Sequence, residues 1–146
     1  MSPAFPAGAF AYSHGLEWAI DDRQVTSADD LKLWIEDLIT RGSGWNDAVL
    51  FARCWEDETG GLNELALALS ASKERYLETA QLGRAFAIAA LVFFPLKRGE
   101  EALAYPVAAG SACAAAGITK SHALLAFLQG FSNALVSVAV RLVPYC

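Results

Sequence analysis

Residues 121–140 read S-H-A-L-L-A-F-L-Q-G-F-S-N-A-L-V-S-V-A-V and carry no formal charge. Apolar side chains recur there and in the following residues in steps of three and four, at Leu124, Phe127, Leu128, Phe131, Leu135, Val138 and Leu142. This spacing places side chains on one face of an α-helix. A second row, in steps of four, forms a narrow polar seam on another face: Gln129, Asn133, Ser137 and Arg141. The pattern predicts a long helix over residues 119–143.

The same stretch is also long enough to cross a lipid bilayer as a helix. However, it contains His122, Gln129 and Asn133, together with three serines and a glycine, which make insertion unfavourable. It also lacks the basic flank and aromatic belt that would orient a spanning helix. We therefore expect a buried core helix and no membrane partner.

The composition sets limits on the size of the protein and on its partners. The chain has 146 residues, enough for one domain with a sizeable core. Hydrophobic residues make up 55% and charged residues 18%, so we expect exposed apolar surface that meets a partner or a second copy. The net charge of −5 opposes binding to nucleic acid, which requires basic patches. Cys54, Cys113 and Cys146 are widely spaced, which favours reduced thiols and a cytoplasmic location over disulfides or a zinc site.

Helix caps and breakers divide the first half of the chain. Ser27 and Asp30 have the spacing of a capping box at the start of a helix, and Gly-Ser-Gly at 42–44 ends that helix. Asn46 or Asp47 is then expected to cap a helix that runs to about residue 58.

The second half of the chain contains further helices. A short apolar helix is expected over residues 62–71, and Ser72 is expected to cap a helix that Pro95 stops. Pro106 suits the first position of another helix, which reaches about residue 116. No segment alternates as a strand does. The sequence therefore predicts an all-α, single-domain bundle of about six to seven helices, preceded by a segment rich in proline and glycine.

That opening segment, residues 3–19, reads P-A-F-P-A-G-A-F-A-Y-S-H-G-L-E-W-A. Residues 11–15 fit A-x-S-x-G, one letter away from the nucleophile elbow of esterases, so Ser13 is a candidate nucleophile. An elbow needs a preceding buried strand, whereas prolines and a glycine precede Ser13, and the only later histidine is His122. We therefore expect Ser13 to cap a helix.

Other candidate sites are equally weak. His14 and Glu17 are spaced to share a helix face, which more often forms a hydrogen-bonded surface or interface pair than a metal site. Glu74 and Glu78 also share a face, but Lys73 and Arg75 flank them, as in a solvated helix start. No phosphate-binding glycine motif occurs. The residues alone predict a helical interaction domain without catalytic residues, metal ligands or a cofactor.

The opening segment strongly resembles the signature of the urease accessory protein F family (UreF), P-x-x-P-x-G-[AS]-[FY]-x-[YF]-S-x-G-L-E. Further segments follow in the order of that family: V-T-S-A-D-D-L-K-L-W-I-E-D-L-I, D-A-V-L-F-A-R, S-K-E-R-Y-L-E-T-A-Q-L-G-R-A-F, Y-P-V-A-A-G and N-A-L-V-S-V-A-V-R-L-V-P. The resemblance covers essentially the whole chain, and its first and last motifs are the specific ones.

The resemblance implies an all-helical, dimer-forming cytoplasmic chaperone without catalysis. Proteins of this family bridge the urease accessory D protein (H in some systems) and the GTPase, accessory protein G, so that nickel enters apo-urease. Nickel is then handled by the complex rather than by this chain. Matching the motifs residue by residue suggests partner contacts at Tyr12, Ser13, His14, Glu17 and Arg141. Internal packing and capping is the alternative role for these residues.

The chain departs from the family pattern at both ends. Only Met1 and Ser2 precede the first proline, where a leucine-rich helix is usual, and the chain stops at Tyr145 and Cys146 after R-L-V-P. We therefore expect residues 1–146 to form a UreF-like domain that is incomplete at both termini. Two rival functions follow: a helical dimerisation module that has lost the maturation role, and a small hydrolase that uses Ser13.

Overall fold

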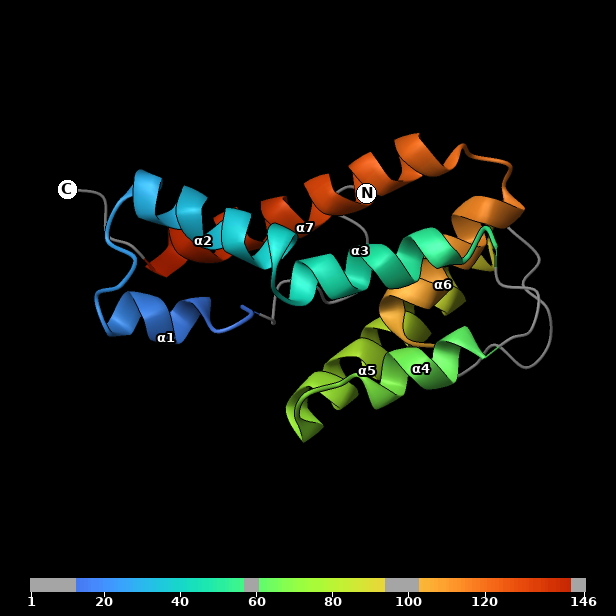
Figure 1. Ribbon diagram of the computed structural model, residues 1–146, viewed down its shortest axis with the longest axis horizontal. Helices are drawn as coiled ribbons and strands as arrows, with labels where there is room; N and C mark the ends of the chain where they lie inside the picture. The colour runs from blue at the N-terminus through green and yellow to red at the C-terminus, as the bar shows by residue number, and fades with distance from the viewer. Residues whose placement is uncertain (1–12, 57–60, 94–102, 143–146) are drawn as a thin grey trace.

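The computed structural model describes residues 13–56, 61–93 and 103–142, which form seven helices and no strand within these ranges (Figure 1). The all-α prediction is confirmed, and the number of helices matches it. The helices in order are α1 (Leu16–Asp21), α2 (Ala28–Thr40), α3 (Ser43–Arg53), α4 (Leu62–Ala68), α5 (Lys73–Ala90), α6 (Tyr105–Ala115) and α7 (Lys120–Leu142).

The helices gather into two groups that α3 and α7 connect. α1 and α2 pack on the C-terminal part of α7, whereas α4, α5 and α6 lie together on the other side of α3 (Figure 1). The first group shares a core of fully or almost fully buried side chains: Leu16, Ala19, Val25, Leu135, Val138 and Ala139. The second group packs mainly alanines around three aromatic rings, those of Phe51, Phe86 and Phe127. The first and last helices of the bundle therefore share one core.

The local signals at three helix starts are confirmed. Ser27 accepts a hydrogen bond from the backbone N–H of Asp30, and the Asp30 carboxylate accepts one from the backbone N–H of Ser27, which is a complete capping box. Ser72 caps α5 through the backbone N–H of Arg75. Pro106 lies in the first turn of α6. Pro95, the predicted stop of α5, lies outside the described residues.

The predicted cap of α3 is wrong. The helix begins at Ser43, with Gly42 at the N-cap and no side-chain cap, so Asn46 and Asp47 lie inside it. The physical reason is that Asp47 is buried and takes a partner from another helix, as described below. α3 ends at Arg53, and residue 58 lies outside the described residues.

Helix α7 has both a packed face and an exposed apolar face. By length and composition alone α7 could cross a membrane, a property that it shares with core helices of soluble proteins. Its buried residues include Phe127 and Leu135, which belong to the predicted apolar row and face the two cores. Leu125 and Val140 lie elsewhere on the helix and are exposed. α7 therefore contributes to both cores while leaving apolar surface uncovered.

Candidate functional site: a buried polar cluster behind the N-terminal motif

The chain enters α1 through two residues in the left-handed backbone region. His14 has φ 50° and Gly15, the N-cap of α1, has φ 81°. The carbonyl of Ser13 accepts a hydrogen bond from Leu16 N–H at 2.9 Å, and α1 has no side-chain cap. The prediction that the Ser13 side chain caps the helix is therefore wrong. A left-handed histidine is uncommon, so its surroundings must hold it in place.

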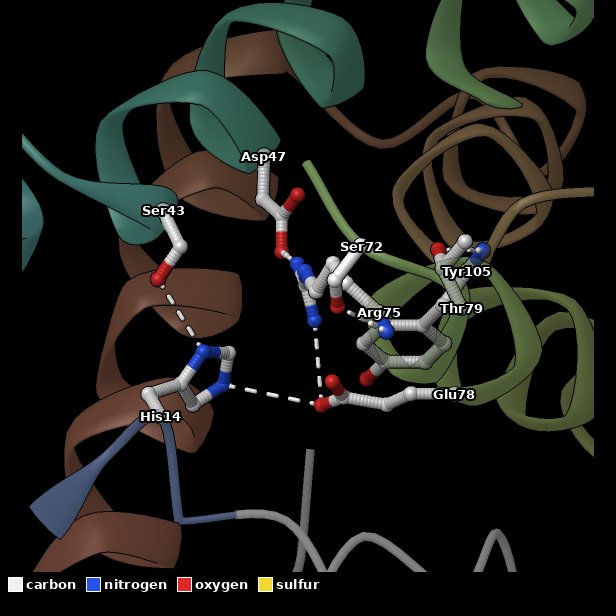
Figure 2. Close-up of polar contacts among 8 residues, drawn as sticks. All are labelled: His14, Ser43, Asp47, Ser72, Arg75, Glu78, Thr79 and Tyr105. Carbon is white, nitrogen blue, oxygen red and sulfur yellow. Dashed lines mark hydrogen bonds and ion pairs between the residues drawn. The ribbon is translucent and has the colours of Figure 1, made fainter. Parts of the chain in front are cut away.

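The imidazole of His14 contacts three helices that are far apart in the sequence. Its Nδ1 lies 3.0 Å from Ser43 Oγ on α3, and its Nε2 lies 3.8 Å from Glu78 Oε1 on α5 (Figure 2). Its ring centroid lies 4.8 Å from that of Phe131 on α7. The start of α1 is thus attached through His14 to the junction of the two helix groups.

Arg75 completes the set of polar contacts from α5. Its guanidinium donates to Asp47 Oδ2 at 2.5 Å and lies 3.0 Å from Glu78 Oε1, so one cation joins two buried carboxylates (Figure 2). Asp47 belongs to α3, and the ion pair therefore links α3 to α5. We refer to His14, Ser43, Asp47, Arg75 and Glu78 as the buried polar cluster.

Burial dominates the electrostatics of the cluster. Burial and, as a smaller cause, the nearby Arg75 charge lower the pKa of His14 to about 4, so the imidazole is neutral at pH 7. Burial also raises the pKa of both Asp47 and Glu78, although Arg75 opposes that shift. Attraction to the two carboxylates raises the pKa of Arg75 in spite of its own burial. Arg75 is therefore the group that allows both acids to stay buried.

Two cavities adjoin the cluster. The larger has a volume of about 430 Å³, and Arg41 and Asn46 line it together with His14, Ser43, Asp47 and Arg75. The smaller, of about 60 Å³, lies on the side of Glu78, Tyr105 and Phe131. His14, Asp47 and Arg75 line both cavities, so these side chains separate them.

The imidazole of His14 lies between the hydroxyl of Ser43 and the carboxylate of Glu78, which is the arrangement of a serine–histidine–acid triad. The geometry nevertheless opposes catalysis. Arg75 lies closer to Glu78 Oε1 than His14 Nε2 does, at 3.0 Å against 3.8 Å, so the acid is committed to the guanidinium. With a pKa of about 4, His14 is too weak a base to take a proton from a serine hydroxyl. The cluster is suited to holding helices together rather than to hydrolysis.

The residues predicted from the sequence are only partly brought together. His14 is mostly covered within the cluster, whereas Glu17 is exposed on α1, so the imidazole faces Ser43 and Glu78 instead. Arg141 lies near the C-terminal end of α7 and donates to the carbonyl of Ser137 at 3.2 Å. Tyr12 lies outside the described residues. Their roles in partner binding remain predictions.

The candidate triad of Ser13 and His122 does not form. His122 lies at the start of α7, where its Nδ1 is 2.7 Å from Thr119 Oγ1. Ser13 precedes α1, which packs against the other end of α7. Within residues 13–56, 61–93 and 103–142, no group of three or more histidine, cysteine, aspartate or glutamate side chains could hold a metal ion.

Glu78 was expected to be solvated, and this expectation is wrong because only 8% of the residue is exposed. A signal for its burial exists in the sequence: Glu78 precedes Leu82 by four residues and Phe86 by eight, and all three are buried on α5. Asp47 likewise precedes the buried Phe51 by four. Glu78 and Asp47 are therefore each a charged residue in an otherwise apolar helical row, a pattern that indicates burial.

Comparison with known proteins gives a consistent result. The UreF family model matches residues 25–145. The urease accessory protein UreF of Brucella ovis is 45% identical over 97% of this chain and 65% of its own length. That of Mesorhizobium japonicum is 47% identical over 97% of this chain and 67% of its own length. The chain thus spans about 65% of the Brucella relative. The family match over most of the chain, together with this identity, shows that the chain belongs to the UreF family.

Proposed function

We propose that this protein acts in urease maturation as a binding protein, without catalysis of its own. It links the D-type accessory protein to the G-type GTPase while nickel is inserted into apo-urease. Nickel is cargo of the complex in this proposal and is not held by this chain. The protein acts in the cytoplasm as a homodimer.

Family membership carries the proposal, and the surface of the protein supports it. Large apolar side chains are exposed on several helices, including Trp18 on α1, Trp45 on α3 and Leu65 on α4. Trp18 is 61% exposed. Exposed tryptophan and leucine side chains in such number are typical of surfaces that meet other proteins, and tryptophan is enriched among the residues that dominate binding energy.

The test is co-purification. The tagged chain is expressed with the D-type accessory protein and the GTPase of its source organism, and the captured proteins are identified. Capture of both partners supports a linking role, and addition of nickel and apo-urease then measures activation. A soluble chain that captures neither partner contradicts the proposal. Trp18→Lys tests one candidate surface: because this side chain is 61% exposed, the substitution is expected to weaken capture without unfolding the chain.

A second function, self-association without a maturation role, is favoured by one observation. Four apolar residues at and just beyond the end of α5 are exposed: Ile88, Leu91, Val92 and Phe93, the last two by 80% and 70%. Co-purification separates the two proposals: both require a dimer, which light scattering after gel filtration detects, whereas only this alternative captures neither accessory protein.

A further inference from the structure

The start of α1 is attached to the bundle by the side chain of His14, a residue in the left-handed backbone region. We propose that His14 is a positioning residue: its imidazole fastens the start of α1 to α3, α5 and α7 and thereby fixes the direction in which Glu17 and Trp18 face a protein partner. The identity of the partner rests on the proposed function, whereas the attachment of α1 through His14 does not depend on that function.

Helix α1 cannot position itself. It has six residues and lacks a side-chain cap, whereas isolated helices need about 12–15 residues to be even marginally stable in water. Two buried apolar side chains, Leu16 and Ala19, attach its inner face to Leu135 and Val138. Apolar contacts of this kind are not directional. A directional contact is therefore needed to fix the rotation of the helix, and His14 provides it immediately before the first turn.

The His14 contacts are directional in three ways. The Ser43 hydroxyl lies at hydrogen-bonding distance from Nδ1, at 3.0 Å, which fixes the plane of the ring. The Phe131 ring packs against the imidazole with the planes inclined by 51°. Glu78 lies on the Nε2 side at 3.8 Å. Together these contacts hold a non-glycine residue in the left-handed region, a conformation that is unfavourable without such support.

The charge on the ring matters for this attachment. Among the described residues, the ionisable groups that line the two cavities with His14 are Arg41, Asp47 on α3, Arg75 and Glu78 on α5, and Tyr105 on α6, while α7 contributes the uncharged Phe131. Protonation would bring a second cation beside Arg75 and would make Nδ1 a donor to the Ser43 hydroxyl oxygen. Burial of the ring and the charge of Arg75 therefore favour the neutral imidazole in this attachment.

Three variants of the full chain and one control variant test the proposal. His14→Ala removes every ring contact. His14→Asn keeps an acceptor within reach of Ser43 and tolerates the left-handed backbone, because asparagine is enriched there. His122→Asn is the matched control, since His122 is the only other histidine and is exposed at the start of α7. Ser43→Ala is a milder variant that removes the hydroxyl alone and serves if His14→Ala does not fold.

The primary measurement is native-state hydrogen exchange, resolved by residue. The reporters are the backbone N–H groups of Leu16, Ala19 and Val25, which donate to Ser13, Gly15 and Ala19 respectively. In His14→Ala we expect the protection of these amides to fall by at least about tenfold, while the protection of α5 and α6 changes by less than about twofold. His14→Asn recovers part of the protection, and His122→Asn leaves it unchanged. Ser43→Ala gives a smaller loss at the same amides.

Two results would overturn the proposal. One is unchanged protection of the α1 amides in both His14→Ala and Ser43→Ala. The other is an equal loss in all helices, which would make His14 an ordinary stabilising residue. The pH profile gives an independent readout: protection of α1 in the wild type falls relative to α5 as the pH is lowered from 7 toward about 4, and His14→Asn lacks this relative change.

Capture of the D-type accessory protein is measured on the same variants. Weaker capture by His14→Ala, with normal capture by His122→Asn, connects the attachment to partner binding. If the wild type itself captures nothing, the proposed function fails, whereas the exchange data still decide whether His14 positions α1.

Discussion

Helices α2 and α6 are of similar length but are held in opposite ways. α6 has six buried residues and no charged side chain, and it packs against α3 and α5. α2 has no fully buried residue, carries five charged side chains and begins with a complete capping box. The contrast is between a helix held by fully buried neighbours and one that combines a complete cap with a partly buried apolar face. Substitutions can therefore be chosen to act on one mechanism and leave the other intact.

The largest expected effect is at the entry to α6. A Cβ atom added at Gly83 on α5 would lie 1.7 Å from the carbonyl oxygen of Leu103, which belongs to the backbone and cannot give way as a flexible side chain can. Gly83→Ala is expected to lower the free energy of unfolding by more than about 4 kcal/mol, although alanine normally stabilises a helix by up to about 1 kcal/mol. Urea unfolding measures the change. Arg84→Ala, on the exposed face, is the control, and a Gly83→Ala protein as stable as the wild type would contradict the close packing.

The ion pairs between α3 and α5 come next. Arg75→Met leaves Asp47 and Glu78 buried without their cation and is expected to lower the free energy of unfolding by about 3–5 kcal/mol. The triple variant Asp47→Asn, Arg75→Met and Glu78→Gln removes the charges together and should recover much of that loss. If the triple variant is no more stable than the single one, the loss does not arise from unpaired charge.

The pH dependence of stability isolates His14. The pKa of His14 is about 4 in the folded protein, whereas the ordinary value is 6.5. Between about pH 4 and pH 6.5, therefore, the imidazole binds a proton in the unfolded chain and not in the folded protein. The contribution of His14 to the free energy of unfolding is complete above pH 6.5. It is lost as the pH falls toward about 4, with a limiting slope of about 1.4 kcal/mol per pH unit. Asp47 and Glu78 act in the opposite sense because their pKa values are raised. The variant His14→Asn keeps both acids. The difference between the unfolding free energies of the wild type and of this variant, measured at each pH, therefore gives the pH dependence that His14 causes. Parallel curves for the two proteins would refute this assignment.

A smaller effect is expected at the start of α2. Ser27→Ala removes half of the capping box and should lower the free energy of unfolding by about 1 kcal/mol, within a range of about 0.5–2 kcal/mol. Helicity by circular dichroism should fall only slightly, because one helix is affected. The same substitution at Ser72, which caps α5, provides the comparison in a helix with a buried face. A loss at Ser27 below the error of measurement would mean that packing, rather than its own sequence, maintains α2.

The smallest effect is expected on the outer face of α2. Leu33 is 62% exposed, so Leu33→Lys should change the free energy of unfolding by no more than about 0.5 kcal/mol. A much larger loss would show that this face is covered in solution. Gel filtration before and after the substitution distinguishes a covered face from an exposed one.

The sequence predicted the helices well because their signals are local. The apolar row from Leu124 to Leu142 and the caps at Ser27 and Ser72 depend on neighbours within one or two turns, and the structure confirms them. Ser13 and Asp47 are the failures. Both residue types favour helix caps, but a left-handed turn at His14 and Gly15 starts α1, and an arginine on another helix holds Asp47.

The buried polar cluster could not be predicted from the same local rules. Its ion pair joins Asp47 to Arg75, 28 residues further along the chain, and its histidine comes from before the first helix. The charges of Lys73 and Glu74 beside Arg75 suggested a solvated turn, which is correct for those two side chains and wrong for Glu78. The position of Glu78 in the row of Leu82 and Phe86 was the available clue, but a pairing between helices becomes visible only once they are packed.

The core that Leu16 and Ala19 share with Leu135, Val138 and Ala139 also determines the order of events during synthesis. The ribosome makes α1 first and α7 last among the described helices, so the inner face of α1 has no surface to pack on until almost all of these helices have been translated. Contacts of such large sequence separation form late, because closing a long loop is entropically unfavourable. Among the described helices, α1 is thus the first to leave the ribosome and among the last to reach its native position, and in that interval its apolar side chains are available to chaperones.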